Sequence, residues 1–514
     1  MKHKSIYEIL EEYSLDFLHE ASNYQYDVAS VEEKLELQAQ EELEQYTYYS
    51  NGFHIDQIIE MSASKIMNFK DFHSLSSLLI RHYKEQSHLL DLNSVIAFDI
   101  KLKDFVGNSI ESKKKRLFSS EILMKKLKKL QYVYAECFRN YKEKSRYCSK
   151  YQVSYINKKI IKEQEMLKNT YIRSESTGKI YNLADMTRSN SSKMSELYCI
   201  NKQLSQVAES KRFTWIFPTF TCPAKFHINA QARDSWDRES NPKESSDFIS
   251  KIWRAIFKRL SQLKISDEIF GCWTKEPHVS MSVHKHALLY VNPEHLKLLK
   301  SVIVQCVKNE YEKEGAFFQA GVSVKIIEEK DSKQLAKKSK KKASPATYIF
   351  KYIMKSMLVE SCVVKENDKD KTIDIDNTDF EAIRAHYRSF SYRRFGFVGL
   401  DRCLGFWREL KRFEQLSLDT NNNKTLETLL SYVKTNNFKS FNDSELRKNV
   451  KMIYACAEYD DLGNVISYKK DDFGDDIKIV IGFKIDSQPF VTRTSFEILN
   501  KSYAELLLSE EKNK

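Results

Sequence analysis

Two tyrosines, Tyr348 and Tyr352, lie four positions apart in a stretch with the signals of a helix. Ser344 is a favourable N-cap residue, and Pro345 suits the first helical position because its missing N–H has no partner there in any case. Residues three and four positions apart share one face of a helix. The face with both tyrosines therefore reads Tyr348, Lys351, Tyr352 and Lys355, and the residues between them form an apolar face.

Two phenol oxygens about one helical turn apart could act as paired nucleophiles toward a phosphate-rich substrate. A free tyrosine has a pKa near 10, so attack at neutral pH needs positive charge nearby, which Lys351 and Lys355 could supply. The simpler alternative is an aromatic pair packed on a core beside two solvated lysines. A lysine block precedes the helix and favours phosphate contacts, although a solvated loop would have the same composition. It comprises Lys330, Lys333, Lys337, Lys338, Lys340, Lys341 and Lys342.

A second group of residues with metal-binding chemistry lies earlier in the chain. His284 and His286 are two positions apart in a predicted strand over 282–291, so both imidazoles leave the same face. Glu276, on the preceding strand, is the expected third ligand, and His278 competes for that role. Two histidines and a carboxylate suit Mg²⁺ or Mn²⁺ when the substrate supplies phosphate oxygens. A histidine pair on the surface or in a core is the alternative.

The elements around these residues follow an alternating pattern. Aromatic and β-branched residues predict strands over 213–221, 268–276, 282–291 and 319–328, and helical spacing predicts helices over 243–264 and 292–314. The order βαββαβ is typical of a ferredoxin-like α+β fold, an antiparallel sheet with helices on one face. The tyrosine helix follows its last strand. An unrelated α+β sheet is the alternative.

The 514 residues are enough for several domains. We expect a helical N-terminal region, a helical lead-in, a central domain that holds the tyrosines and histidines, and a small α+β C-terminal unit. Their predicted ranges are 1–145, 146–210, 211–416 and 424–514. Within the central domain, the polar and acidic residues 366–379 are expected to form a loop, and three successive asparagines at 421–423 predict a linker.

Composition narrows the possible functions. The 83 lysines and arginines exceed the 71 acidic residues, and the net charge of +12 suggests a polyanionic partner. Nine cysteines without a Cys-x-x-Cys pair indicate neither a disulfide framework nor a zinc knuckle. No apolar run is long enough for a membrane span or signal peptide, so we expect a cytoplasmic protein without a membrane partner. There is no Gly-x-x-x-x-Gly-Lys loop, so any strand separation would depend on another protein.

These motifs resemble the HUH endonuclease superfamily, and specifically the phage replication gene A proteins. The resemblance covers about residues 145–415. Besides the histidine strand and the tyrosine helix, it includes five shorter motifs: residues 220–227 (FTCPAKFH), 276–278 (EPH), 407–410 (WREL), 147–149 (YCS) and 183–190 (LADMTRSN). Lys285 departs from the pattern, because the residue between the histidines is usually bulky and apolar. Its side chain should point to the opposite face of the strand, so local packing is more in doubt than the metal site.

The resemblance implies a site-specific nickase for single-stranded DNA at a replication origin. A divalent ion held by His284, His286 and Glu276 would polarise the scissile phosphate, and Tyr348 or Tyr352 would form a 5′-phosphotyrosine. It also implies rolling-circle replication, in which the second tyrosine permits another strand transfer without ATP and a host helicase and polymerase act on the product. A single-strand transposase or relaxase and a non-catalytic origin-binding protein are the alternatives.

Overall fold

The computed structural model describes most of the chain after residue 101 and short parts before it. The described residues are 76–77, 79–81, 83–85, 87–92, 102–175, 178–186, 190–229, 235–237, 240–329, 349–350, 352–354, 361–366, 369–374, 379–400, 403–415, 420, 422–460, 464–493 and 496–512. The predicted lysine block before the tyrosine helix lies outside the described residues. None of the described helices is long and apolar enough to cross a membrane.

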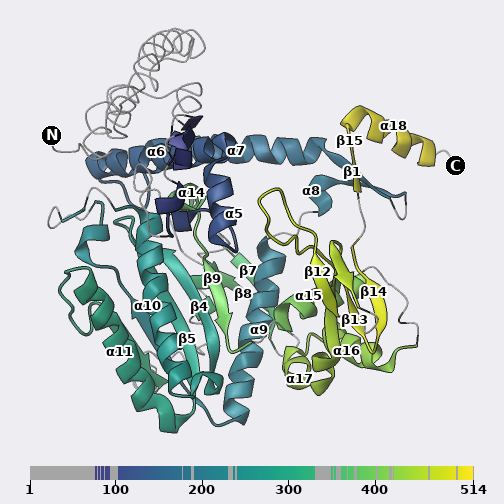
Figure 1. The fold of residues 1–514 in the computed structure, drawn as a ribbon. Coiled ribbons are helices and arrows are strands. Elements are labelled where there is room, and N and C mark those ends of the chain that lie inside the picture. Colours follow the sequence, from purple (N-terminus) through teal and green to yellow (C-terminus); the bar gives the residue numbers. More distant parts are fainter. Residues whose placement is uncertain are drawn as a thin grey trace, which may run out of the picture.

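A five-stranded antiparallel sheet forms the centre of the molecule (Figure 1). In spatial order its strands are β6 (Val324–Glu328), β3 (Thr214–Phe220), β5 (Val283–Val291), β4 (Ile269–Pro277) and β9 (Phe395–Val398). Helix α10 (Pro242–Gln262) connects β3 to β4, and α11 (Leu296–Lys313) connects β5 to β6. The predicted βαββαβ order is therefore present, and the α+β prediction is confirmed. Strand β9 adds a fifth strand beside β4.

Helices cover both faces of this sheet. On one face, α10 and α11 share a core with apolar strand residues such as Ile216, Ile269 and Leu289. On the other face, α9 (Asn190–Ser210) and the helical residues 349–350 and 352–354 pack over Phe217, Leu288 and Tyr290. The prediction placed helices on one face only. Burial of both faces explains why almost every residue of β4 and β5 is buried.

The start of α10 shows how local sequence sets an element boundary. Asn241 Oδ1 accepts hydrogen bonds from the backbone N–H groups of Lys243 and Glu244, and the Glu244 carboxylate accepts one from the Asn241 N–H. This capping box, with Pro242 at the first helical position, satisfies N–H groups that a helix start otherwise leaves unpaired. The predicted helix over 243–264 is confirmed.

Described parts of the N-terminal region are helical, as predicted. They include α5 (Ile110–Leu117), α6 (Ser120–Glu143) and two short 3-10 turns, η1 (Ser87–Leu89) and η2 (Leu102–Asp104). Helix α6 and α14 (Phe380–Phe390) pack against the loop between β4 and β5, where Val133, Met281 and Tyr387 share a core. The N-terminal region therefore supports the sheet end that carries Glu276 and His284.

Residues 146–210 are only partly helical. Between α7 (Lys150–Asn169) and α9 they form a hairpin, β1 (Tyr171–Ser174) and β2 (Ile180–Asn182), followed by the single turn α8 (Leu183–Met186). Strand β1 also pairs with β15 (Phe496–Leu499) near the C-terminus. The helical prediction missed this hairpin because its strands are three or four residues long and β1 has a partner more than 300 residues away.

The prediction of a loop over 366–379 was wrong for its first half. Strands β7 (Ser361–Glu366) and β8 (Lys369–Asp374) form an antiparallel hairpin in register from Ser361–Asp374 to Glu366–Lys369. Segment β8 reads KDKTID, so its polar composition suggested a loop. Pairing of its backbone groups with β7 outweighs the weak strand preference of Asp and Lys.

The C-terminal part combines helices and strands, as the predicted α+β unit requires. It includes α16 (Lys424–Lys434), α17 (Phe438–Asp443) and β13 (Val480–Ile485). The additional elements are β10 (Val450–Tyr454), β11 (Ala457–Tyr459), β12 (Val465–Tyr468), β14 (Gln488–Val491), β15 and α18 (Lys501–Lys512). The apolar core of the C-terminal part is continuous with the core under α9, and α15 (Cys403–Gln415) connects the two. The domain boundaries remain predictions.

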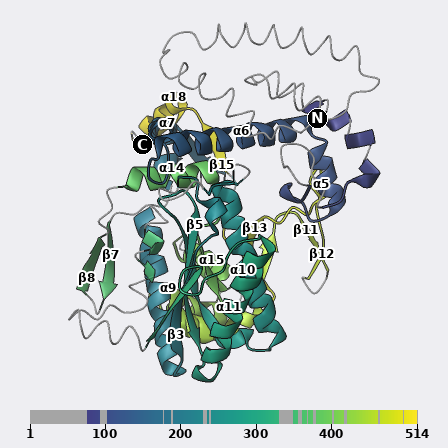
Figure 2. The same cartoon turned by 90° about the vertical axis from the view of Figure 1, so that its left-hand side faces the viewer.

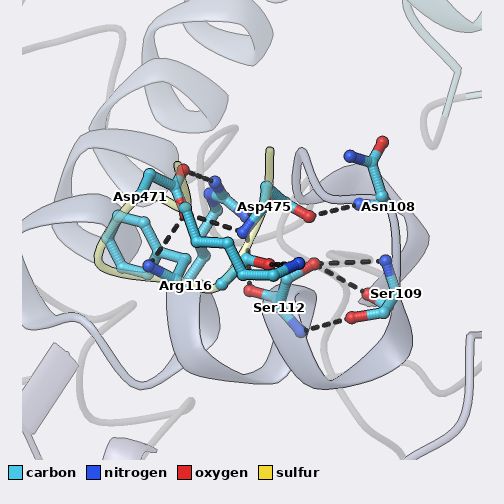
Figure 3. Close-up of polar contacts among 9 residues, drawn as sticks. Asn108, Ser109, Ser112, Arg116, Asp471 and Asp475 are labelled. Atoms are coloured by element: carbon cyan, nitrogen blue, oxygen red, sulfur yellow. Dashed lines mark hydrogen bonds and ion pairs between the residues drawn. The ribbon is translucent and has the colours of Figure 1, made fainter. Parts of the chain in front are cut away.

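An ionic contact ties the C-terminal part to helix α5 (Figure 3). The Arg116 guanidinium donates to the carboxylates of Asp471, at 2.6 Å, and Asp475, and it lies 4.5 Å from the centre of the Phe473 ring. Asp475 also accepts a hydrogen bond from the Asn108 backbone N–H at 2.8 Å. Two segments about 355 residues apart in sequence are therefore held together by a largely buried cation.

Candidate active site

Glu276, His284 and His286 lie on one face of the central sheet. Glu276 is the cross-strand partner of His284, and Thr274 is the partner of His286. Directly paired residues project to the same side of a sheet, as do residues two apart along a strand. This is the face covered by α9 and the helical residues 349–350 and 352–354. The structure therefore brings together the three predicted metal ligands on the side toward the tyrosine helix.

His286 lies at the centre of this group. Its Nδ1 is 3.0 Å from Thr219 Oγ1 on β3, and its Nε2 is 3.4 Å from Glu276 Oε2 on β4. The Tyr352 ring stacks on the imidazole with a centroid distance of 4.2 Å and an angle of 27° between the planes. Residues from three strands and from the tyrosine helix thus converge on one imidazole.

The tyrosine helix packs as its sequence pattern predicts. Ile349, Phe350, Ile353 and Met354 are at most 2% exposed and belong to the core under α9. Tyr352 is half-buried, and its ring contacts His286 and Phe217. Burial of the apolar face thus turns Tyr352 toward the sheet and its histidines. Tyr348, Lys351 and Lys355 lie outside the described residues.

His284 has a nitrogen atom without a partner. Its Nε2 is buried and makes no hydrogen bond, although buried polar atoms are usually paired. The His278 ring stacks on His284 at 4.6 Å between centroids. Burial, with the neighbouring histidines, lowers the pKa of His284 well below its usual value and that of His278 to about 4. Both imidazoles are therefore neutral near pH 7, the form in which a histidine binds a metal.

A third imidazole, His227, holds His278 in place. His227 Nε2 is 3.1 Å from the Cys222 carbonyl oxygen, which can only accept, so this nitrogen carries the proton. Its Nδ1 is then an acceptor, 2.6 Å from the Ser280 hydroxyl, and Ser280 Oγ is also 2.7 Å from His278 Nδ1. The serine joins the two imidazoles, and this network fixes the His278 ring beside His284.

On the opposite face of the sheet, Lys285 is buried between two tryptophans. Its ammonium lies 3.5 Å from the centre of the Trp253 ring and 4.0 Å from that of Trp273. Burial lowers the pKa of Lys285 well below its usual range. The prediction that this side chain points away from the histidines is confirmed. Contacts of the lysine side chain with two tryptophan rings therefore take the place of the bulky apolar residue expected at this position.

These residues suit a divalent ion in type, but they do not form a complete site. Two imidazoles and a carboxylate project from one face, and the buried His284 Nε2, which has no hydrogen-bond partner, can donate an electron pair to a metal ion. However, the described residues contain no group of three or more His, Cys, Asp or Glu side chains placed to hold a metal. Glu276 contacts His286 and His278 contacts His284, so both remain candidates for the third ligand.

Several residues around the site were not predicted from the sequence. Thr219 and Phe217 on β3 contact His286, whereas Ser280 and His227 hold His278. His227 ends the motif over 220–227, seven residues after the last residue of β3. This position near the end of a strand is the local signal that favours it as a partner of the other histidines. The contacts of Ser280 and Thr219 depend on strand pairing, and no local signal reveals them.

The fold and site define an α+β protein whose antiparallel sheet presents two histidines, a carboxylate and a stacked tyrosine on one face. The model of the bacteriophage replication gene A protein (GPA) family matches residues 53–358, more than half of the chain. The chain belongs to this family. The match includes the histidine strand and the tyrosine helix.

Several relatives are replication proteins of phages. The replication protein of Haemophilus phage HP1 is 29% identical over 41% of this chain and 25% of its own length. The probable replication protein P12 of Pseudoalteromonas phage PM2 is 25% identical over 72% of this chain and 56% of its own length. A probable replication endonuclease from a prophage-like region of Salmonella paratyphi A is 24% identical over 32% of this chain and 19% of its own length. The matches thus span only about a fifth to about half of these relatives, and no solved structure matches significantly.

Proposed function

We propose that this protein is an HUH-type endonuclease that nicks single-stranded DNA at a replication origin through a 5′-phosphotyrosine intermediate and so starts rolling-circle replication. The stacking of Tyr352 on His286, at 4.2 Å between centroids, is the observation that carries the proposal. It brings a potential nucleophile to the two-histidine face of the sheet. Membership of the GPA family and the relatives named replication endonuclease support a nuclease activity.

In the proposed reaction, a phenol oxygen of Tyr352 or Tyr348 attacks the scissile phosphorus in line with the leaving group. A bond forms between phosphorus and the tyrosine oxygen, and the bond from phosphorus to the 3′ oxygen breaks. The phenol proton is released, and the leaving 3′ oxygen takes up a proton to become a free 3′-OH. The phosphodiester energy is kept in the tyrosine ester, so the step requires no ATP.

The chain's own residues prepare this reaction in three ways. His284, His286 and Glu276 would hold a Mg²⁺ or Mn²⁺ ion, which would polarise the scissile phosphate when bound. Thr219 fixes the His286 ring through Nδ1, which leaves Nε2 toward Glu276. The core under the tyrosine helix fixes the direction of Tyr352. Precise support of this kind determines how well a site positions its substrate.

Lys351, Lys355 and the second tyrosine complete the proposal. The two lysines would stabilise a phenolate or the charge that develops on the phosphate. The second tyrosine would attack a later phosphodiester while the first remains esterified, which ends one round of replication and begins the next. A host polymerase would extend the 3′-OH, and a host helicase would unwind the duplex. The host cytoplasm is the expected location.

A covalent-adduct assay tests the nucleophiles. Wild-type protein is incubated with origin single-stranded DNA and Mn²⁺, and the adduct is measured on a denaturing gel beside Tyr348→Phe, Tyr352→Phe and the double variant. We expect either single variant to keep some adduct and the double variant to form none. Adduct formation by the double variant would refute the nucleophile assignment.

Chelation tests the metal separately. Excess EDTA should abolish cleavage, whereas salt-sensitive DNA binding should largely persist because lysine contacts with phosphates need no metal. Cleavage at the wild-type rate in EDTA would rule out the metal role. A strand-transfer assay with two DNA substrates would separate a replication initiator from a transposase or relaxase, and absence of any adduct would favour a non-catalytic origin-binding protein.

A further inference from the structure

A group of lysines gathers where α5, η2 and α6 meet the first turn of α10. Lys113 Nζ on α5 donates to the Lys103 carbonyl oxygen at 3.4 Å, and Lys126 Nζ on α6 donates to the Asp104 carbonyl oxygen at 2.6 Å. Both ammonium groups are therefore anchored on the same 3-10 turn, η2. Lys126 also lies 4.6 Å from the centre of the Phe105 ring, so its side chain is held in place.

Further lysines extend this group toward the central sheet. Lys129 lies on α6, three residues after Lys126 and so on the same helix face. Burial lowers the pKa of Lys126, and the nearby charges of Lys129 and Lys243 lower it further. Lys103, Lys129 and Lys243 are exposed. We name the five residues the basic surface: Lys103, Lys113, Lys126, Lys129 and Lys243.

Carboxylates offset this charge only in part. Asp104 attracts Lys126, and Asp247 lies 2.5 Å from Lys243. Glu111, Glu121 and Glu244 lie in the first turns of α5, α6 and α10, but Glu121 pairs with Lys125 and Glu244 caps its own helix. The lysines therefore keep a positive field that attracts anions. The energetic cost of such a cluster is recovered when a polyanion binds.

The basic surface leads toward the candidate active site. Lys243 lies in the first turn of α10, and Ser245, in the same turn, accepts a hydrogen bond from the Val283 backbone N–H at 3.1 Å. Val283 directly precedes His284. The basic surface therefore ends beside the start of β5. DNA bound there would pass the end of this strand to reach the histidines on the other face of the sheet.

We propose that the basic surface binds the sugar–phosphate backbone of the DNA that flanks the nicking site. This inference rests on the proposed function only in taking DNA as the polyanion. The basic surface comes from the helical N-terminal region and α10, so it lies outside the tyrosine and histidine face. It would hold the substrate in register while the phosphate at the site reacts.

A triple variant with Lys103, Lys129 and Lys243 each changed to Gln tests the proposal. The matched control changes three exposed lysines of α11, Lys297, Lys308 and Lys313, to Gln. In both views α11 lies at the opposite end of the molecule from α6 (Figures 1 and 2). Binding of a single strand and of a duplex, each about 40 nucleotides long, is measured in EDTA by fluorescence anisotropy over a range of salt concentrations, with lengths chosen to exceed one binding site.

The triple variant should bind at least one of the two DNA forms about tenfold more weakly at about 0.1 M salt. A plot of the logarithm of its association constant against the logarithm of salt concentration should have a slope smaller in magnitude by about 2 to 3. The control should keep the wild-type slope. An unchanged slope for both DNA forms, or an equal loss in the control, would overturn the proposal. Binding in EDTA requires no chemistry, so failure of the proposed nicking reaction would appear only in the adduct assay.

Discussion

At the scale of single residues, the unpaired His284 Nε2 is the strongest indication that the site binds a ligand. It is buried, its imidazole is held neutral, and it makes no hydrogen bond. An unsatisfied buried polar atom costs about 1–3 kcal/mol. This unpaired atom belongs to the sheet face that also carries His286 and Glu276, and it supports the proposal of a divalent ion there.

The first prediction concerns that ion. His284→Gln should lower Mn²⁺ affinity at least about tenfold, because loss of one ligand or of its orientation commonly costs that much. Free Mn²⁺ is measured by electron paramagnetic resonance in a titration of the folded protein. His295→Gln is the control, since His295 lies at the start of α11 and its imidazole is 3.4 Å from the Glu268 carboxylate, away from the candidate site. Equal affinity in both variants would argue against His284 as a ligand.

A pH dependence of stability should come from His386, which is fully buried away from the site. Its Nδ1–H donates to the Tyr147 carbonyl oxygen at 2.9 Å, and burial lowers its pKa to about 4. Between about pH 6.5 and pH 4 the unfolded histidine binds a proton that the folded one does not. This group should therefore lower the free energy of unfolding as pH falls through that window, by at most about 3 kcal/mol.

The measurement is urea denaturation at several pH values for the wild type and His386→Leu. The variant should lose the part of the pH slope that His386 supplies, whatever its absolute stability. If both proteins show the same slope between pH 6.5 and pH 4, His386 is not the group responsible.

At the scale of elements, the pairing of β4 with β5 determines whether a site forms at all. A shift of one residue would turn Glu276 away from His284 and place Lys275 on the site face. Gly271 helps to hold this register, because a Cβ atom there would lie 1.9 Å from the Leu288 carbonyl oxygen. The strands approach too closely at this point for any other residue.

Gly271→Ala should therefore lower the free energy of unfolding by at least about 2 kcal/mol, because the backbone of β5 must shift. Gly405→Ala is the matched control: it lies in helix α15 with no atom within 4 Å of the added Cβ. That change should stabilise by about 0.5–1 kcal/mol. Both are measured by urea denaturation, and destabilisation by the control alone would contradict the close-approach argument.

At the scale of the whole molecule, distant segments close the structure around the central sheet. Strand β15 pairs with β1, and Glu409 on α15 accepts hydrogen bonds from Thr492 and Arg493 of the C-terminal part. Arg116 joins α5 to the loop with Asp471 and Asp475 (Figure 3). The N-terminal and C-terminal parts therefore support each other as well as the sheet.

Arg116→Gln should release this loop, because Asp471 and Asp475 lose their cation and Phe473 loses its stacking partner. We expect limited proteolysis within residues 464–478 to become several-fold faster, since loop protection depends on such local contacts. The control is Arg173→Gln, which breaks the exposed pair with Glu497 elsewhere. Equal cleavage rates at this loop in wild type and Arg116→Gln would show that the contact does not hold it.

The sequence by itself determined the local features of this protein. Alternation and helical spacing located β3 to β6, α10 and α11, because each pattern reflects burial of a face by neighbouring residues in the chain. The same logic placed His284 and His286 on one face, Lys285 on the other, and the apolar side of the tyrosine helix in a core. These predictions depend only on local periodicity, which is two residues in a strand and three to four residues in a helix.

Only the tertiary structure decided which distant groups meet. The stacking of Tyr352 on His286, the bridge from His227 through Ser280 to His278, and the pairing of β1 with β15 all join residues that no local period relates. The tertiary structure also decided two further features. Strand β8 is polar and forms only because it pairs with β7, and the basic surface forms only because separate helices bring its lysines together. Such contacts depend on how complete faces of helices and sheets pack together, so no local sequence pattern predicts them.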